Sequence, residues 1–212
     1  ERTKGVSSTQ LRIEAQSVIE LGIIGSGRIA NRFIKESKYV SGIEVKGVLN
    51  PKIESAKSFC EKNELNFYCT EYEDFIARVD AVYISSPHLT HYDYIRRSLE
   101  HGKHVLCEKP IASSLAAGKR FYSLVKGTQQ KVLVAHILRH NKSYQKVAEL
   151  IQSGAIGRLR LIRMVQNHHA INWQRYKRLM ADCPPIVDCG VHYIDVMQWF
   201  SGSRVVEVSG IS

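Results

Sequence analysis

Two charged residues, Glu108 and Lys109, follow a short apolar stretch, His104–Cys107, and come directly before Pro110. Such a stretch is typical of a buried strand in a parallel sheet, and ligands bind these sheets beyond the carboxyl ends of the strands. Pro110 favours extended backbone at Lys109, which would hold both charges at the edge of a cleft. A surface ion pair at an ordinary strand end is the alternative, and this stretch alone does not decide between them.

Asp188 and His192 form a second pair that could do chemistry. They are four residues apart, so on a helix they would share one face and the acid could orient the imidazole ring. Oxidation of an alcohol removes the hydroxyl proton as hydride leaves, and histidine suits that role near neutral pH. Lys109 would stabilise the developing alkoxide. The alternatives are a helix N-cap for Asp188, after Pro184-Pro185, and a packed core histidine for His192.

A glycine turn follows the apolar stretch 18–24 and has the pattern of a dinucleotide-binding loop. Gly25 would allow the tight bend, and Gly27 would let the backbone approach a pyrophosphate, which the next helix receives at its amino terminus. Ala30 would keep that helix close to the strand. The expected cofactor contacts in this loop are Gly25, Ser26, Gly27, Arg28 and Ile29.

Asn50 stands where such folds usually carry an acidic residue, roughly 20 residues after the turn, that holds the adenosine ribose. A neutral amide can bond a ribose but does not repel a 2′-phosphate, and Lys52 is close enough in sequence to attract one. Asn50 and Lys52 are therefore expected cofactor contacts, and NAD and NADP both remain open.

Strand and helix patterns alternate regularly through residues 18–139, which predicts parallel βαβ units with right-handed crossovers. The expected strands are 18–24, 43–49, 66–68, 81–85, 104–107 and 131–135, and the expected helices are 31–38, 53–62, 72–76, 90–101 and 113–126. The pattern of elements then changes. The expected elements are a helix at 143–153, a strand with one solvent-facing side at 158–166, a helix at 188–200 and a strand at 204–211. We interpret residues 140–212 as the truncated start of a second domain, whose missing strands would cover the edge of 204–211.

The composition limits the class of protein. With 212 residues, 44% of them hydrophobic and 24% charged, the chain fits one large or two small globular domains. It has no apolar run of about 18 residues, and residues 1–17 look like a linker or disordered lead-in without a secretory signal. Five cysteines, an odd number, suggest a reducing compartment, so we expect a cytoplasmic protein without membrane contact.

The formal charge of +10 does not by itself indicate nucleic acid. Basic residues are spread over the chain, and there is no basic tract with interleaved aromatic residues, so no nucleic-acid partner is expected. Cys183, Cys189, His192 and the pair His168-His169 fit no standard zinc spacing, so no metal is expected either.

Several motifs together resemble, in order and type, the glucose-fructose oxidoreductase, inositol dehydrogenase and MocA family over about residues 18–212. They are Gly25–Ala30, Pro87 with His91, His101–Pro110, Arg139, Ile151–Gly157 and Asp188–Asp195. The resemblance implies an α/β protein with an amino-terminal Rossmann dinucleotide-binding domain, at 18–139, and a carboxyl-terminal α/β domain with an open, mostly antiparallel sheet. That sheet would hold the substrate and the interface of a homo-oligomer, a dimer or tetramer.

The activity that the resemblance implies is hydride transfer between NAD or NADP and a carbinol or carbonyl carbon of a sugar, cyclitol or related polyol. Lys109 matches the lysine between cofactor and substrate, His192 the catalytic histidine, Asp188 the acid beside it and Asp195 a further active-site acid. Further implied cofactor contacts are Ser86, Pro87, His91 and Glu108. His168, His169, Asn172 and Trp173 fall in the substrate-facing region, where a surface loop is equally compatible.

The chain also departs from the family pattern. His88 stands where asparagine is frequent, and Asp182–Val187 replaces a glycine-rich run, which would reshape the pocket. A dinucleotide-binding regulator or sensor without catalysis is the alternative function, and the joint presence of Lys109, Asp188 and His192 speaks against it.

Overall fold

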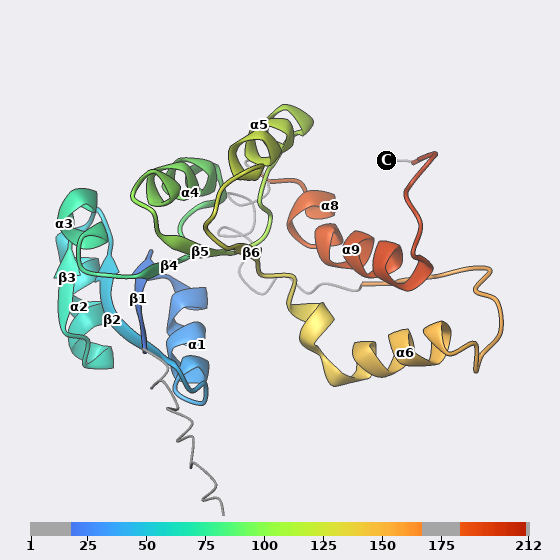
Figure 1. Cartoon of the computed structure of the whole chain (residues 1–212), viewed down its shortest axis with the longest axis horizontal. Coiled ribbons are helices and arrows are strands. Elements are labelled where there is room, and N and C mark those ends of the chain that lie inside the picture. Colours follow the sequence, from blue (N-terminus) through green and yellow to red (C-terminus); the bar gives the residue numbers. More distant parts are fainter. Residues whose placement is uncertain (1–17, 167–182, 211–212) are drawn as a thin grey trace, which may run out of the picture.

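The computed structural model describes residues 18–166 and 183–210, and its centre is one parallel sheet of six strands in the order β3-β2-β1-β4-β5-β6 (Figure 1). The strands are β1 (Ile19–Ile24), β2 (Ile43–Leu49), β3 (Phe67–Cys69), β4 (Ala81–Ile84), β5 (His104–Cys107) and β6 (Val132–Val134). The strand order reverses between β1 and β4, and such a switch point leaves a crevice at the carboxyl ends of the strands.

Helices cover both faces of the sheet, which explains why most residues of its strands are apolar. One core contains Phe75, Ile76 and Ile95, and the other contains Ile34 and Phe59. The helices that supply these residues are α1 (Arg28–Ser37), α2 (Ile53–Asn63), α3 (Tyr72–Ile76) and α4 (His91–Glu100), and α5 (Leu115–Val125) packs beside α4. All four residues of β4 are buried.

The predicted parallel βαβ organisation is confirmed, and most boundaries lie close to those expected. Strands β2 and β5 and helix α3 have the predicted bounds. Helix α1 begins at Arg28, inside the glycine turn, and a 3-10 turn, η1 (His88–Thr90), precedes α4. The difference at α1 arises because the glycine turn leads straight into the helix, as a phosphate-binding turn must.

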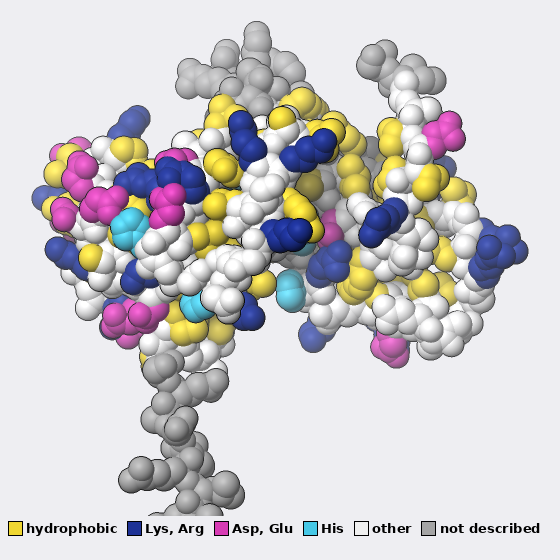
Figure 2. Space-filling model, turned by 45° about the horizontal axis from the view of Figure 1, so that its top comes forward, with side chains coloured by type: hydrophobic (Ala, Val, Ile, Leu, Met, Phe, Trp, Pro, Cys, Tyr) yellow, Lys and Arg dark blue, Asp and Glu magenta, His cyan; other side chains and the backbone are white. Residues whose placement is uncertain are grey.

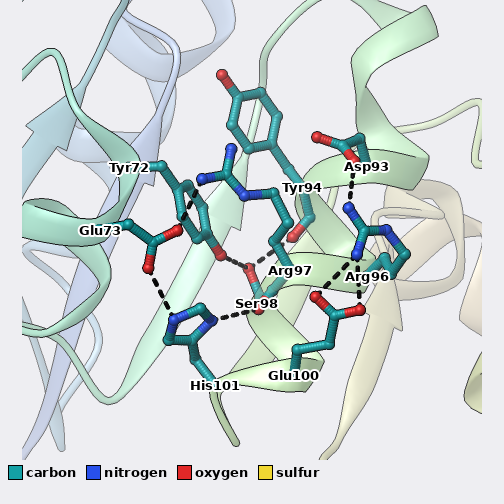
Figure 3. Close-up of polar contacts among 9 residues, drawn as sticks. All are labelled: Tyr72, Glu73, Asp93, Tyr94, Arg96, Arg97, Ser98, Glu100 and His101. Carbon is teal, nitrogen blue, oxygen red and sulfur yellow. Dashed lines mark hydrogen bonds and ion pairs between the residues drawn. The ribbon is translucent and has the colours of Figure 1, made fainter.

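A polar cluster joins α3 to α4 on the surface (Figure 3). The buried Tyr72 hydroxyl lies 2.9 Å from Ser98 Oγ, and burial raises the pKa of Tyr72 to about 12. The Arg97 guanidinium lies 3.8 Å above the Tyr72 ring and pairs with Glu73, which also pairs with His101. A buried tyrosine keeps its hydroxyl bonded in this way, and the cluster holds two helices to the same core.

The carboxyl-terminal part lies beyond β6 (Figure 1). It contains a 3-10 turn, η2 (Ile137–His140), then α6 (Lys142–Gln152), α8 (Pro185–Asp188) and α9 (Gly190–Ser201). Helices α6 and α9 contact each other through Tyr144 and Phe200, whose ring centroids are 6.2 Å apart. The helix expected at 188–200 is thus divided at Cys189, and the N-cap role for Asp188 is wrong, since Asp188 ends α8.

The two strands expected in this part, at 158–166 and 204–211, are not formed among the described residues. Residues 158–166 and 202–210 pair with no strand, and the sheet of the described chain is wholly parallel. A strand is stabilised by hydrogen bonds to a neighbouring backbone, and neither segment has such a neighbour. Their apolar side chains are instead exposed, Leu161 to 82% and Val206 to 98%. Figure 2 shows hydrophobic side chains at the surface on this side, and charges of both signs mixed over the sheet half.

Within the described ranges, 18–166 and 183–210, no helix combines the length and apolarity needed to cross a membrane.

Candidate active site

The structure brings Lys109 and Asp188 together at the carboxyl end of β5. Lys109 Nζ donates to Asp188 Oδ1 at 2.8 Å and to the Asp188 carbonyl oxygen at 2.9 Å. Both side chains are mostly buried, with exposed fractions of 19% and 12%. The peptide bond between Lys109 and Pro110 is cis. The two motifs are far apart in the sequence, yet they meet in one charge-assisted pair shielded from solvent.

Asp188 is held as a carboxylate by this contact. Burial acts to raise its pKa, but the hydrogen bond and the positive charge of Lys109 outweigh burial, so the pKa lies below its usual value. Cys189 Sγ lies 3.5 Å from the other carboxylate oxygen. The acid therefore positions the lysine, and the described residues show no hydrogen bond between it and His192, although the sequence predicted that Asp188 would orient this ring.

His192 lies in the first turn of α9, and its Nδ1 is buried with no hydrogen-bond partner among the described residues. Burial lowers the pKa of His192, and the nearby charge of Lys109 lowers it further. The ring is therefore neutral near pH 7 and able to accept a proton. A buried polar atom without a partner requires an explanation, and a hydroxyl of a bound substrate is one.

Asp195, a predicted active-site acid, is engaged in holding α9 to η2. Both of its oxygens accept hydrogen bonds from the Arg139 guanidinium at 2.8 Å, and His136 Nδ1 lies 3.8 Å from Oδ2. Arg139 also lies over the Trp199 ring, at 5.6 Å. Sequence reasoning named Arg139 and Asp195 separately and missed this bidentate pair, for which neither residue type nor spacing gives a signal.

Glu108 does not bond Lys109 in the structure. Its backbone N–H donates to the Ile84 carbonyl, and Tyr83 donates its hydroxyl proton to Glu108 Oε1 at 2.7 Å. Tyr83 is buried in β4 and stacks on Phe33 at 3.8 Å between ring centroids, and burial raises its pKa. Tyr83 thus fixes the Glu108 carboxylate from inside the sheet. The sequence did not single it out, although a tyrosine inside an apolar strand is a signal for a buried hydroxyl with a partner.

The glycine turn has the shape that a pyrophosphate requires. Gly25 has φ +97°, and a Cβ there would lie 3.0 Å from the Ser86 backbone nitrogen. Gly27 has open space within 4 Å, and as the N-cap of α1 it offers no side chain to the free N–H groups of the first turn. The exposed Arg28 begins α1, and Ile29 packs partly against the core. The residues present therefore fit a dinucleotide, with the helix amino terminus left for its phosphates.

Asn50 ties the end of β2 to this turn. Its Nδ2 donates to Ser26 Oγ at 2.8 Å, and its Oδ1 accepts from the Lys52 backbone N–H at 2.9 Å. The predicted residues of the adenosine end thus lie side by side.

Ser86, Pro87 and His91 occupy the loop after β4. Ser86 Oγ lies 2.7 Å from Thr90 Oγ1, and Pro87 is the N-cap of η1. His91 is fully buried, with Nε2 2.9 Å from the Ser86 carbonyl oxygen and Nδ1 3.1 Å from the Pro110 carbonyl oxygen. Burial lowers its pKa. Both ring nitrogens face backbone carbonyls inside the protein, and the cofactor contact expected for His91 stays a prediction.

The substrate residue Trp173, with His168, His169 and Asn172, lies outside the described residues. In the described part of the chain, no group of three or more His, Cys, Asp or Glu side chains is arranged to hold a metal ion.

Comparisons with known proteins agree with this geometry. The model of an oxidoreductase family with an NAD-binding Rossmann fold, GFO/IDH/MocA, matches residues 19–136, and that of the GFO/IDH/MocA C-terminal domain matches residues 144–212. The chain is 29% identical over 194 residues to an inositol 2-dehydrogenase of Corynebacterium glutamicum, covering 90% of this chain and 56% of that protein. It is 26% identical to a 1,5-anhydro-D-fructose reductase of Ensifer adhaerens, covering 90% and 59%.

A solved structure has the same fold. The scyllo-inositol dehydrogenase of Lactobacillus casei, with bound NAD(H) and scyllo-inositol, superposes with a TM-score of 0.80 at 24% identity, over 88% of this chain and 57% of that one. The chain thus spans little more than half the length of these relatives. Because the two family models together cover both the sheet and the carboxyl-terminal part, the chain belongs to the GFO/IDH/MocA family of oxidoreductases with an NAD-binding Rossmann fold.

Proposed function

We propose that the protein is an NAD- or NADP-dependent oxidoreductase that acts on a CH–OH carbon of a sugar, cyclitol or related polyol. The observation that carries the proposal is the buried contact of Lys109 Nζ with Asp188, beside a half-buried neutral His192. The related inositol 2-dehydrogenase and 1,5-anhydro-D-fructose reductase support this substrate class.

Each of the three residues has a separate task. A bound nicotinamide supplies the hydride acceptor in oxidation and the donor in reduction. His192 takes the hydroxyl proton of the alcohol, since its Nδ1 has no other partner among the described residues. Lys109 stabilises the alkoxide as charge develops, and Asp188 positions the ammonium through two hydrogen bonds.

The division of the chain follows from the same proposal. Residues 18–139 form the dinucleotide domain, and residues 140–212 begin a substrate domain whose open, mostly antiparallel sheet would pair the segments 158–166 and 204–211. The exposed apolar side chains of these segments support this, because an unpartnered apolar face needs a cover. The same sheet would carry the interface of a homo-oligomer. The odd number of cysteines, five, four of them buried, supports a cytoplasmic location.

The test is a comparison of Lys109→Ala with Lys131→Ala, which removes an exposed lysine next to β6. Lys109→Ala should bind dinucleotide within about twofold of the natural protein and lose turnover by about 100-fold or more. Nicotinamide absorbance across a panel of cyclitols and sugars measures turnover. Unchanged turnover in Lys109→Ala would contradict the assigned role, and dinucleotide binding without turnover of any substrate would instead indicate a regulator.

A further inference from the structure

The end of β2 and the glycine turn form one polar corner, made of Ser26, Arg28, Asn50 and Lys52, which we call the β2 corner. Gly25 N–H donates to the Leu49 carbonyl at 2.8 Å, so the backbones of the two loops are bonded to each other. In Rossmann folds this corner faces the adenosine ribose, and an acidic residue there binds the 2′-hydroxyl of NAD. The β2 corner has no carboxylate at that position, because Asn50 occupies it.

The Asn50 amide has a fixed orientation in the β2 corner. The Lys52 backbone N–H can only donate, so the atom that it meets at 2.9 Å must be Oδ1, and the NH₂ group must be the one that meets Ser26 Oγ at 2.8 Å. Asn50 therefore donates to Ser26. Its amide is used to hold the two loops, in contrast to an acid that would remain free to accept from a ribose.

This orientation sets the direction of the Ser26 hydroxyl. Because Oγ already accepts from Asn50, the hydroxyl proton needs an acceptor elsewhere, and the described residues supply none. Ser26 is only partly buried, so the proton is available to a ligand. The β2 corner thus presents a donor where an NAD-specific site presents an acceptor.

The charges of the β2 corner also favour a phosphate as the ligand. The Arg28 and Lys52 side chains are exposed and have no ion pair in the described ranges. Further along the same helices, Arg32 pairs with Glu36 and Lys57 with Glu61. Arg28 and Lys52 are thus the cations nearest the turn, neither is paired with a carboxylate among the described residues, and a dianionic phosphate would complement both.

We propose that the β2 corner binds the 2′-phosphate of NADP(H), so that this protein prefers NADP(H) to NAD(H). Ser26 and Lys52 donate to the phosphate, Arg28 adds positive charge, and Asn50 positions Ser26 and the Lys52 backbone. A free 2′-hydroxyl would leave the ammonium of Lys52 without a partner and find no acidic acceptor at Asn50. The inference rests on the proposed dinucleotide site, and it deepens that proposal by naming the cofactor.

The test measures binding, which does not depend on turnover. Dissociation constants for NADPH and NADH are taken from nicotinamide fluorescence of the purified protein, and adenosine 2′,5′-bisphosphate and AMP are used as competitors that probe the adenosine half alone. NADPH should bind about tenfold or more tightly than NADH, and the bisphosphate should compete better than AMP. NADPH binding should weaken steeply with salt, while NADH binding changes little.

Three variants distinguish phosphate binding at the β2 corner from an unspecific effect of positive charge on dinucleotide binding. Lys52→Ala should weaken NADPH binding about tenfold and NADH binding less than about twofold. Asn50→Asp should reverse the preference, because a carboxylate repels the phosphate and accepts from the ribose. Lys57→Ala removes an exposed lysine of α2 that already pairs with Glu61, and it should leave both constants unchanged.

The outcomes distinguish this inference from the proposed function. Equal or tighter NADH binding by the natural protein, or an equal loss for both cofactors in Lys52→Ala, would overturn the inference and leave the oxidoreductase proposal standing. Failure of both dinucleotides to bind the natural protein would overturn both. Far-ultraviolet circular dichroism of each variant shows whether it is folded.

Discussion

The sheet half of the molecule, residues 18–136, and the described carboxyl-terminal half, residues 137–166 and 183–210, differ in how their apolar residues are covered. In the sheet half every strand has a neighbour, and residues such as Phe75 and Ile23 are fully buried. In the carboxyl-terminal half α6 and α9 contact each other, but Leu161, Val206 and Val208 are largely exposed. The site lies where the halves meet, and only one of them has a core of its own within the described residues.

This difference affects how the residues of the candidate site are held in position. Lys109 follows the strand β5 by two residues, whereas Asp188 ends the four-residue helix α8 and His192 lies on α9, in which only Val196 is buried among the described residues. Their position relative to Lys109 depends on the hydrogen bonds across the boundary, chiefly Lys109–Asp188 and Arg139–Asp195.

The largest expected effect tests the contrast in core packing. Phe75→Ala should lower the free energy of unfolding by about 3–5 kcal/mol, because it empties a fully buried site between two strands and α3. Leu161→Ala, the matched change in the exposed half, should alter it by less than about 0.5 kcal/mol. Urea denaturation of the 212-residue chain measures both. A similar cost for the two variants would remove the contrast.

The second prediction concerns the contact that joins the halves. Asp188→Asn removes the charge that holds Lys109 and should reduce kcat by about 100-fold, because the ammonium is no longer fixed beside the reacting oxygen. Steady-state kinetics on the best polyol of the panel measures the loss.

Asp93→Asn is the matched control for this change, since its carboxylate pairs with Arg96 on the surface of α4. It should leave kcat unaltered. If Asp188→Asn and the control behave alike, the Lys109–Asp188 contact has no part in turnover.

The third prediction is a pH dependence. Burial lowers the pKa of His192, so the ring stays neutral, and able to accept a proton, below the usual histidine value of about 6.5. For alcohol oxidation, kcat/KM should therefore fall only as the pH drops below about 6.5. His192→Asn should abolish this acidic limb together with most of the activity. An acidic limb above pH 7 would contradict the assignment.

The stability of the folded protein should also fall as the pH falls, because of His91. Its pKa is lower in the folded protein than in the unfolded chain, so the unfolded chain binds more protons as the pH falls. The contribution to stability is present above the unfolded pKa, about 6.5, and is lost as the pH falls towards the folded pKa. Urea midpoints at pH 7.5 and 5.5 measure this, and His91→Gln should show a smaller decline between them.

The smallest expected effect is a difference between the coupling free energies of two ion pairs. A double-mutant cycle on Arg139 and Asp195 should give a coupling of about 1 kcal/mol, since the pair is bidentate and Asp195 is mostly buried. The same cycle on the exposed pair Arg96–Glu100 should give about 0.3 kcal/mol. Equal couplings would mean that the boundary pair is no more than a surface contact.

The sheet half was predictable because its signals are local. The stretches 43–49 and 104–107, in which most residues are apolar, gave strands with the observed bounds, and Gly25 and Gly27 located the turn. The alternation at 158–166 is equally local, yet it yields no strand, since pairing depends on a neighbour elsewhere in the chain.

The site was predictable in residue type but not in contacts. Lys109, Asp188 and His192 were all identified, and two of them do meet. Which group bonds which is decided by where the helix α8 ends relative to β5, and spacing within one motif does not contain that information. His91 shows the same limit, because a histidine whose buried ring lies between two backbone carbonyls has no local signature that separates it from one that faces a ligand.

The burial of His91 between two carbonyls has a mechanical consequence. Its ring lies between the Ser86 carbonyl, in the loop after β4, and the Pro110 carbonyl, next to Lys109 in the loop after β5. A neutral imidazole has one N–H, so it donates to one of these carbonyls and packs against the other. Because the buried ring fills the space between the two backbones, we expect a displacement of the loop at Ser86 to move the backbone that carries the lysine as well.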